Sequence, residues 1–211
     1  MIPERIEDYA RLMSDPESEV LQRLKRETQA KVLKPRMLSG HLQGKLLEMI
    51  SLMHKPSRIL EIGTFTGYSA ICLAQGLTQD GLLHTIDHNP ELEDFARHFF
   101  TQAGLQNKII QHIGEALDVI PGMNEAFDLV FIDADKENYV TYFEMVFDKM
   151  PVGGIILADN VLWDGKIIRV PAPNDSETQG IIRFNQYIRD HKGVQKLLLP
   201  HRDGLSLIRK K

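Results

Sequence analysis

The segment that most constrains this chain lies at residues 59–69, where an apolar strand pattern runs into a glycine-bearing turn and then into a helical pattern. The strand carries a carboxylate, Glu61, and the turn contains Gly63 and Gly67. A strand, a glycine turn and the start of a helix form a place that can hold a nucleotide-like ligand in an α/β fold. An ordinary buried strand-to-helix connection is the alternative interpretation.

The spacing of the two glycines narrows the choice of ligand. The turn has the form G-x-x-x-G, which differs from the dinucleotide fingerprint G-x-G-x-x-G, and the Gly-Lys-Ser/Thr sequence of a P-loop is absent. Glu61 lies close to where phosphates would bind and would repel them. We therefore expect a ligand with a cationic end, a requirement that S-adenosylmethionine meets with its ammonium and sulfonium groups.

The hydrophobic pattern from residue 57 onward alternates between strands and helices, which predicts an α/β fold with a doubly wound, mostly parallel, Rossmann-like sheet. The last two strands are joined by a short turn, so they should form an antiparallel C-terminal hairpin. We expect one domain over residues 1–211, with a helical cap at 1–56 and an α/β core at 57–211. The seven expected strands are residues 58–62, 82–87, 108–113, 127–133, 154–159, 194–199 and 205–208.

Composition and charge exclude several classes of protein. The chain has 211 residues with 43% hydrophobic content and a net charge of −4, so it lacks the overall basic field of a non-specific nucleic-acid binder. A basic cluster near the C-terminus, which includes Arg202 and residues 209–211, leaves a local patch open. The single cysteine, Cys72, rules out an intrachain disulfide, and we expect it to be a buried small residue. The chain shows neither a signal peptide nor a run of 18 apolar residues, so we expect a cytoplasmic protein without membrane contact.

Acidic or glycine residues stand at four of the expected strand ends. These are Glu61 with Gly63, Asp87, Asp133, and Asp159 with Asn160. Ligands of parallel α/β sheets bind outside the carboxyl ends of the strands, so these residues are candidates for a common site. Asp87 can accept hydrogen bonds from both hydroxyls of a ribose, in an NAD site as well as in an S-adenosylmethionine site. Residues 114–116 could border an adenine ring, whereas Ser69 is either a ligand contact or only a helix-start residue.

A second group of candidates follows two central strands. Asp133 and Asp159 end adjacent strands, and Asn160 adds an amide oxygen. Such hard oxygen ligands suit Mg²⁺, Mn²⁺ or Ca²⁺. The alternative is that Asp159 and Asn160 form a turn and that Asp133 caps the next helix.

Lys136 lies three residues beyond Asp133. An amine beside a divalent cation should have a lowered pKa and could then remove a proton from an acceptor hydroxyl. The alternative is a surface lysine in the first turn of a helix at residues 137–150.

Four stretches of the chain resemble the cation-dependent class I O-methyltransferases, the group of the caffeoyl-CoA and catechol O-methyltransferases, and the bacterial members are closest in style. The stretches are RILEIGTFTGYS at 58–69, TID at 85–87, FDLVFIDADKENY at 127–139 and LADN at 157–160. The resemblance extends to MLSG at 37–40 and DGLSL at 203–207, so it covers nearly the whole chain.

The resemblance implies a role for each matching residue. The implied contacts of S-adenosylmethionine are Ser39, Glu61, Gly63, Ser69, Asp87, Ala116 and Asp135. Asp133, Asp159 and Asn160 would bind the metal, and Lys136 would act as the general base, with Asp133 beside it in the catalytic site. The implied reaction is methyl transfer from the sulfonium to one of two vicinal aromatic hydroxyls. Homodimers are common in the family, so a homodimer is expected here as well.

The choice of acceptor is the least determined feature. Trp163 could form one wall of an aromatic acceptor site or could simply pack in the core, and Lys166 and Arg169 could meet an anionic tail or be solvated. The same chemistry on a hydroxylated tRNA base and a non-catalytic S-adenosylmethionine-binding protein are the alternatives. An NAD-dependent oxidoreductase is disfavoured by the turn spacing and by Glu61.

Overall fold

The computed structural model describes residues 4–211, which form a seven-stranded mixed sheet in the order β3-β2-β1-β4-β5-β7-β6. The strands are β1 (Arg58–Ile62), β2 (Leu82–Asp87), β3 (Ile109–Ile113), β4 (Leu129–Ile132), β5 (Ile155–Asp159), β6 (Val194–Leu199) and β7 (Leu205–Lys210). All seven expected strands are thus confirmed, including the antiparallel pairing of β6 with β7. Residues 1–3 of the expected helical cap lie outside the described residues.

Residues 4–211 also contain eight α-helices and five short 3₁₀ turns. The helices are α1 (Glu4–Leu12), α2 (Glu19–Lys31), α3 (His41–His54), α4 (Tyr68–Ala74), α5 (Glu93–Gln102), α6 (Ala116–Val119), α7 (Tyr139–Phe147) and α8 (Ser176–Asp190). The 3₁₀ turns are η1 (Pro35–Met37), η2 (Pro90–Leu92), η3 (Ile120–Gly122), η4 (Lys136–Asn138) and η5 (Trp163–Ile168). None of these helices has the length and apolar character that crossing a lipid bilayer needs.

Two compact units share the sheet. The first comprises the residues before Leu60 together with Thr64–Glu115, and the second comprises Leu60–Gly63 and Ala116–Lys211. The boundary therefore falls within β1. Whether the chain behaves as one domain, as the sequence predicts, stays a prediction.

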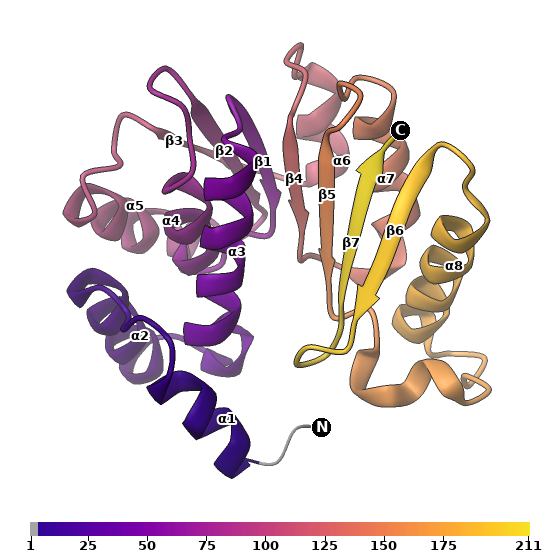
Figure 1. The fold of residues 1–211 in the computed structure, drawn as a ribbon, viewed down its shortest axis with the longest axis horizontal. Helices are drawn as coiled ribbons and strands as arrows, with labels where there is room; N and C mark the ends of the chain where they lie inside the picture. The colour runs from indigo at the N-terminus through magenta and orange to yellow at the C-terminus, as the bar shows by residue number, and fades with distance from the viewer. Residues whose placement is uncertain (1–3) are drawn as a thin grey trace. The chain divides into compact units, whose positions relative to one another are not determined.

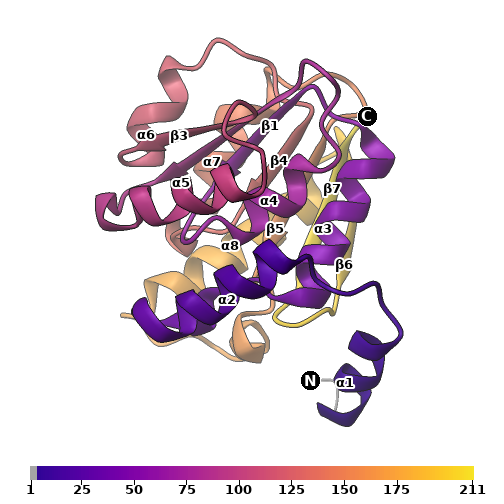
Figure 2. The ribbon, with the colours of Figure 1, turned by 90° about the vertical axis from the view of Figure 1, so that its left-hand side faces the viewer.

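In the first unit, small residues let helices approach closely. Gly44 of α3 faces α4, where a Cβ would lie only 2.6 Å from the Tyr68 ring and 2.9 Å from the Cys72 sulfur. The side chain of Ser18 caps α2 by accepting a hydrogen bond from the Leu21 amide at 3.3 Å. Figure 2 shows α2 lying along α4 and α5, both of which it contacts. The packing of α3 on α4, and of α2 on α4 and α5, thus holds these helices together within the first unit.

In the second unit, β4, β5, β7 and β6 lie side by side, and α8 runs alongside β6 and packs on α7 (Figure 1). Each of the four residues of β4 is buried, as expected for a central parallel strand. Gly180 of α8 has no side chain because a Cβ there would overlap the carbonyl oxygen of Lys136. Close packing of α8 on η4 therefore fixes the backbone at Lys136.

Candidate functional site

The second unit brings the expected metal ligands to one edge of the sheet. β4 and β5 are parallel neighbours with Ile132 opposite Ala158, so Asp133 and Asp159 are the next residues on the two strands. Asp159 is only 3% exposed, and its Oδ1 accepts a hydrogen bond from the Asn160 amide at 2.8 Å. Asn160 has a left-handed backbone with φ of 57°, a conformation that asparagine tolerates better than most residues.

Lys136 lies within this group and not on the surface. Its Nζ donates hydrogen bonds to Asp133 Oδ1 at 3.1 Å, to Asn160 Oδ1 at 2.9 Å and to Tyr139 Oη at 2.7 Å. The residue is 6% exposed. A buried ammonium is stable only when its three hydrogens find acceptors, and these three oxygens provide them. The surface-lysine alternative is therefore wrong.

Tyr139 belongs to the same cluster, although the sequence reading did not single it out. It is fully buried, and its hydroxyl lies 3.1 Å from the Asp159 carbonyl oxygen, to which it can donate. Burial, together with the negative charges of Asp133 and Asp159, raises the pKa of the Tyr139 phenol well above its ordinary value. The phenol is therefore neutral and can accept from Lys136 while it donates to the backbone. Its spacing of three residues from Lys136 was the available signal, because side chains three apart share a face of a helical turn.

The surroundings of Asp159 strongly perturb its carboxyl group. Burial raises the pKa of Asp159 to about 7, and the charge of Asp133 adds to that rise. The Asn160 amide, Arg202 and Lys136 act in the opposite direction. A carboxylate as buried as that of Asp159 needs positive charge beside it to remain ionised next to another carboxylate.

The donor set fits a hard divalent cation. Across residues 4–211, no group of three or more His, Cys, Asp or Glu side chains is arranged to hold a metal. The expected set has a different composition, since it consists of two carboxylates and the amide oxygen of Asn160. Mg²⁺ and Ca²⁺ prefer oxygen donors of this type. A bound cation would also supply the positive charge that the carboxylate of Asp159 needs in order to ionise. The residues present are therefore compatible with such an ion.

The backbone of the glycine turn packs directly against the backbone of Asp133. Gly63 has φ of 106°, and a Cβ there would overlap the carbonyl oxygen of Asp133. The Asp133 amide in turn donates to the Ile62 carbonyl oxygen at 2.9 Å. Glu61, two residues before Gly63, is fully buried. The shape of the turn and the position of Asp133 thus depend on each other.

The remaining expected cofactor residues of the second unit differ in their surroundings. Ala116 is the buried first residue of α6. Asp135 is exposed, and its carboxylate accepts hydrogen bonds from the Tyr142 hydroxyl and from Asn138 Nδ2. Asp135 therefore links η4 to the first turn of α7 through these two hydrogen bonds.

The first unit contains the other expected cofactor residues, Ser39, Ser69 and Asp87. Both carboxylate oxygens of Asp87 accept backbone hydrogen bonds, Oδ2 from Phe65 at 2.7 Å and Oδ1 from Asn89 at 2.9 Å. Ser39 and Ser69 are buried at 8% and 6% exposure. A small hollow lies beside Asp87, and Asp87 is the one expected cofactor residue among the described residues that line it. It is lined by Thr64, Phe65, Asp87, Asn89, Leu92, Glu93, Gln111 and Ile113.

The loop that follows Asn160 has an unusual backbone. Trp163, Asp164 and Gly165 are three successive residues with left-handed φ angles of 49°, 52° and 72°. The Trp163 ring lies 5.7 Å from the ammonium of Lys136 and 5.5 Å from that of Lys166. Its indole Nε1 is buried and makes no hydrogen bond within the described part of the chain. Trp163 therefore borders the Lys136 cluster and is not simply a core residue.

Comparison with known proteins agrees with this arrangement. A family model described as O-methyltransferase matches residues 11–211. A catechol O-methyltransferase of Niastella koreensis is 34% identical over 174 residues, which are 78% of each chain. Caffeoyl-CoA O-methyltransferase 2 of Petunia hybrida is 32% identical over 80% of this chain and 74% of its own.

Solved structures show the same likeness in three dimensions. The O-methyltransferase TomG of Streptomyces achromogenes, in complex with S-adenosylmethionine, superposes with a TM-score of 0.92 at 30% identity over 100% of this chain and 99% of its own. An O-methyltransferase of Bacillus cereus in complex with S-adenosylhomocysteine gives 0.91 at 31% identity, over 98% and 97% of the two chains. These matches confirm the doubly wound, Rossmann-like fold. The chain therefore belongs to the O-methyltransferase family of S-adenosylmethionine-dependent enzymes.

Proposed function

We propose that this enzyme transfers the methyl group of S-adenosylmethionine to a hydroxyl of a small aromatic acceptor with two vicinal hydroxyls, and that the reaction depends on a divalent cation. The observation that carries the proposal is the Lys136 cluster, where the Nζ atom lies within 3.1 Å of oxygens of Asp133, Tyr139 and Asn160. The amine stands beside the expected metal ligands at this edge of the sheet, where its neutral form can accept a proton from a hydroxyl brought there.

Asp133, Asp159 and Asn160 would hold the cation, which when bound lowers the pKa of a hydroxyl and stabilises the oxyanion that forms. Lys136 Nζ, as the neutral amine, accepts the hydroxyl proton, and Tyr139 keeps the amine in position. The hydroxyl oxygen then forms a bond to the methyl carbon while the carbon–sulfur bond breaks, which leaves S-adenosylhomocysteine. Trp163, beside Lys136, would form a wall for the aromatic ring.

The cofactor contacts are proposed at the residues expected from the sequence: Ser39, Glu61, Gly63, Ser69, Asp87, Ala116 and Asp135. Glu61 would accept from the ammonium of the methionine end. Asp87, whose carboxylate is held by two backbone amides, would accept from the ribose hydroxyls. A pre-positioned carboxylate costs less conformational entropy to use than a mobile one, which supports this assignment.

The acceptor class is supported by the relatives, since catechol and caffeoyl-CoA are named as acceptors in the names of proteins 31–34% identical to this chain. Three of the basic C-terminal residues argue against the tRNA alternative, because their side chains are already engaged. Lys210 Nζ donates to the carbonyl oxygens of Phe147 and Met150 at 2.7 and 2.9 Å, and Lys211 Nζ donates to Lys192 O at 2.8 Å. Arg209 donates to Gln195 Oε1 at 3.1 Å.

A homodimer in the cytoplasm is also part of the proposal. Large apolar side chains are exposed on α1 and α3, including Ile6, Tyr9, Leu12 and Met53, and such surface is usually covered by a partner. Light scattering coupled to size-exclusion chromatography would decide the oligomeric state, and a monomer at micromolar concentration would contradict it.

The decisive experiment combines a panel of catechols with methyl-labelled S-adenosylmethionine, with and without EDTA. We expect methylation that EDTA abolishes and Mg²⁺ restores, and full activity in EDTA would rule out the metal role. A total tRNA fraction in the same panel tests the RNA alternative. Cofactor binding without methylation of any acceptor would favour a non-catalytic protein.

A further inference from the structure

The turn between β6 and β7, residues 201–204, has no role in the proposed reaction, although the stretch DGLSL at 203–207 is one of those that resemble the family. β7 pairs antiparallel with β5, and Leu205, the first residue of β7, lies opposite Asp159, the last residue of β5. The turn therefore lies directly beside the loop that follows Asp159 and carries Trp163.

Three hydrogen bonds join the turn to this loop. The Val161 amide donates to the Gly204 carbonyl oxygen at 3.2 Å. The Leu162 amide donates to the Asp203 carbonyl oxygen at 2.8 Å. The Asp164 amide donates to Oδ1 of Asp203 at 2.6 Å. The first two bonds join backbone to backbone, so the Asp203 carboxylate is the side chain through which the turn binds the loop.

The loop needs such support because its backbone conformation is unfavourable. Trp163 and Asp164 have positive φ angles of 49° and 52°, although each has a Cβ. Successive left-handed residues other than glycine persist only where the surrounding contacts hold them. Asp203 binds the amide of the second of these residues, so its carboxylate stabilises this conformation directly.

Two further contacts hold the beginning of the loop. Gly204 has φ of 89°, and a Cβ there would lie 2.5 Å from Leu162 Cγ and 2.9 Å from the Leu162 nitrogen. A residue without a side chain therefore lets the turn approach this closely. Asn185 of α8 donates from Nδ2 to the Val161 carbonyl oxygen at 2.8 Å. The loop backbone is thus held both by the turn and by α8.

The position of the Trp163 ring depends on this backbone. The ring lies 5.7 Å from the ammonium of Lys136, the proposed base. An aromatic acceptor would have to lie against the ring while its hydroxyl reaches Lys136. We propose that Asp203 is a positioning residue, which binds the Asp164 amide, holds Trp163 beside Lys136 and thereby sets the affinity for aromatic acceptors. The link to acceptor binding rests on the proposed function, whereas the position of Trp163 can be tested without turnover.

The first test uses the fluorescence of Trp163, which is the only tryptophan in the sequence. Its indole Nε1 is buried, so loss of the support should move the emission maximum to longer wavelength and increase quenching by acrylamide. Asp203→Ala should show both changes. Asp203→Asn keeps an oxygen that can accept from the Asp164 amide and should stay close to the wild type. Wild-type emission in Asp203→Ala, or equal shifts in the two variants, would overturn the proposal.

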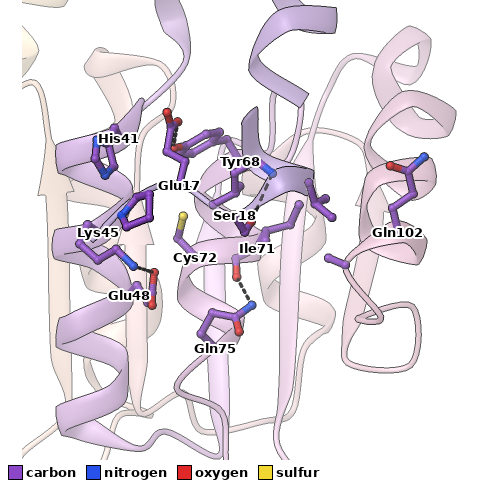
Figure 3. Close-up of a pocket in the computed structure, with 14 residues that line it drawn as sticks. Glu17, Ser18, His41, Lys45, Glu48, Tyr68, Ile71, Cys72, Gln75 and Gln102 are labelled. Carbon is purple, nitrogen blue, oxygen red and sulfur yellow. Dashed lines mark hydrogen bonds and ion pairs between the residues drawn. The ribbon is translucent and has the colours of Figure 1, made fainter. Parts of the chain in front are cut away.

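Glu17→Ala is the matched control for a general loss of stability. Glu17 also joins two distant segments, because its Oε1 accepts a hydrogen bond from the Tyr68 hydroxyl at 2.6 Å. Both residues line a cavity of about 340 Å³ between α2, α3, α4 and α5 of the first unit (Figure 3). Thermal melting measures the stability of each variant, and the control should keep the wild-type emission. If Glu17→Ala shifts the emission as much as Asp203→Ala does, the shift reports instability and the proposal fails.

The second test measures the methylation of catechol. Asp203→Ala should raise the KM for catechol by about tenfold, the change expected when one hydrogen bond to a charged group is lost. Its kcat and its Kd for S-adenosylmethionine should be nearly unchanged, because a wall for the ring contributes equally to the bound substrate and to the transition state. Asp203→Asn should restore the low KM. An unchanged KM in Asp203→Ala would refute the role of Asp203 in acceptor binding.

A double variant decides whether Asp203 acts through the ring. In a Trp163→Leu background, Asp203→Ala should raise the KM by less than about twofold, because residues that act through one contact are not additive. A full effect in both backgrounds would show that Asp203 acts independently of Trp163 and would refute the proposal. If the wild type methylates no catechol, the proposed function fails, while the emission test still decides whether Asp203 holds Trp163.

Discussion

At Lys136 a single ammonium satisfies oxygen atoms from Asp133, Tyr139 and Asn160. The three contacts match the three hydrogens of an ammonium, which is the form that Lys136 has once it has taken a proton from the acceptor. To act as a base, Lys136 must present the neutral amine to the acceptor hydroxyl. The hydrogen bonds that hold the side chain decide where the amine stands when it reacts.

Removal of the amine should stop the reaction without disturbing the cofactor. We expect Lys136→Met to lower kcat by about 10²–10⁴-fold, the usual contribution of a general base. Lys136→Arg should be nearly as inactive, because a guanidinium does not give up its proton. Labelled methyl transfer gives kcat and calorimetry gives the Kd of S-adenosylmethionine. A Lys136→Met enzyme with most of its activity would show that another group removes the proton.

Tyr139→Phe tests whether the position of the amine matters. The variant keeps the ring that packs edge-on against Phe184 at 5.4 Å between centroids but loses the hydroxyl that accepts from Lys136. We expect kcat to fall by about tenfold, with an unchanged Kd for S-adenosylmethionine, because one hydrogen bond to a charged group is lost. Tyr187→Phe, which removes a hydroxyl of α8 that is bonded to Glu144 and not to a site residue, is the control for loss of a hydroxyl in general. Equal effects of the two variants would argue against a specific role of Tyr139.

At the scale of an element, the turn after β1 depends on the absence of a side chain at Gly63. Its φ of 106° and the contact with the Asp133 carbonyl both exclude a Cβ. Gly63→Ala should therefore destabilise the protein by about 2–4 kcal/mol, as backbone strain and overlap add together. Gly104→Ala is the control, since φ there is 71° but no atom lies within 4 Å of the added Cβ. It should cost only about 1 kcal/mol, and urea unfolding of both variants measures the difference.

The start of α8 gives a prediction about pH. Asp175 Oδ1 accepts from the Thr178 amide at 3.1 Å and Oδ2 from the Thr178 hydroxyl at 2.7 Å, and these bonds lower the pKa of Asp175. A lowered pKa means that the stabilisation is present above the ordinary aspartate pKa of about 4 and is lost as pH falls below it.

Asp175→Ala should accordingly lower the melting temperature by about 2–4 °C at pH 7 and by less at pH 3.5. Asp175→Asn retains an oxygen that can accept from Thr178 and should lower it less at pH 7. Thermal melts of the three proteins across this range test the prediction. A difference between wild type and Asp175→Ala that grows toward low pH would contradict the assigned sign.

At the scale of the whole molecule, a bound cation should increase the free energy of unfolding. A ligand that binds only the folded chain and is present at 100 times its Kd stabilises by about 2.7 kcal/mol. For a chain of this size, such a gain raises the melting temperature by about 5–10 °C. We expect Mg²⁺ or Mn²⁺ to raise the melting temperature of the wild type but not that of Asp159→Ala. Asp118→Ala, which changes an exposed residue of α6, is the control and should respond like the wild type. If Asp159→Ala keeps the shift in melting temperature, the cation binds at a site that does not include Asp159.

The strands could be predicted from the sequence because their signal is local. Apolar runs of four to six residues, such as those that end at Ile62 and Ile132, alternate with helical periodicity and leave one consistent topology. Strand ends in a parallel sheet meet at one edge, so the nearness of Asp133 and Asp159 also followed. The helix boundaries could not be predicted in the same way. Where the sequence predicts one helix at 137–150, the structure has η4 followed by α7. That boundary depends on packing against Gly180, which is more than 40 residues away in the chain.

The sequence by itself determined the sheet, the glycine turn and the residue types of the site, because these depend on periodicity and spacing along the chain. Only the tertiary structure decided that Lys136 is buried and bonded to Asn160, that Tyr139 joins it, and that Trp163 stands beside it. The same holds for the cavity between α2, α3, α4 and α5, whose wall combines residues from four separate helices. Burial and charge environment arise from contacts between distant segments, and those contacts exist only once the chain has folded.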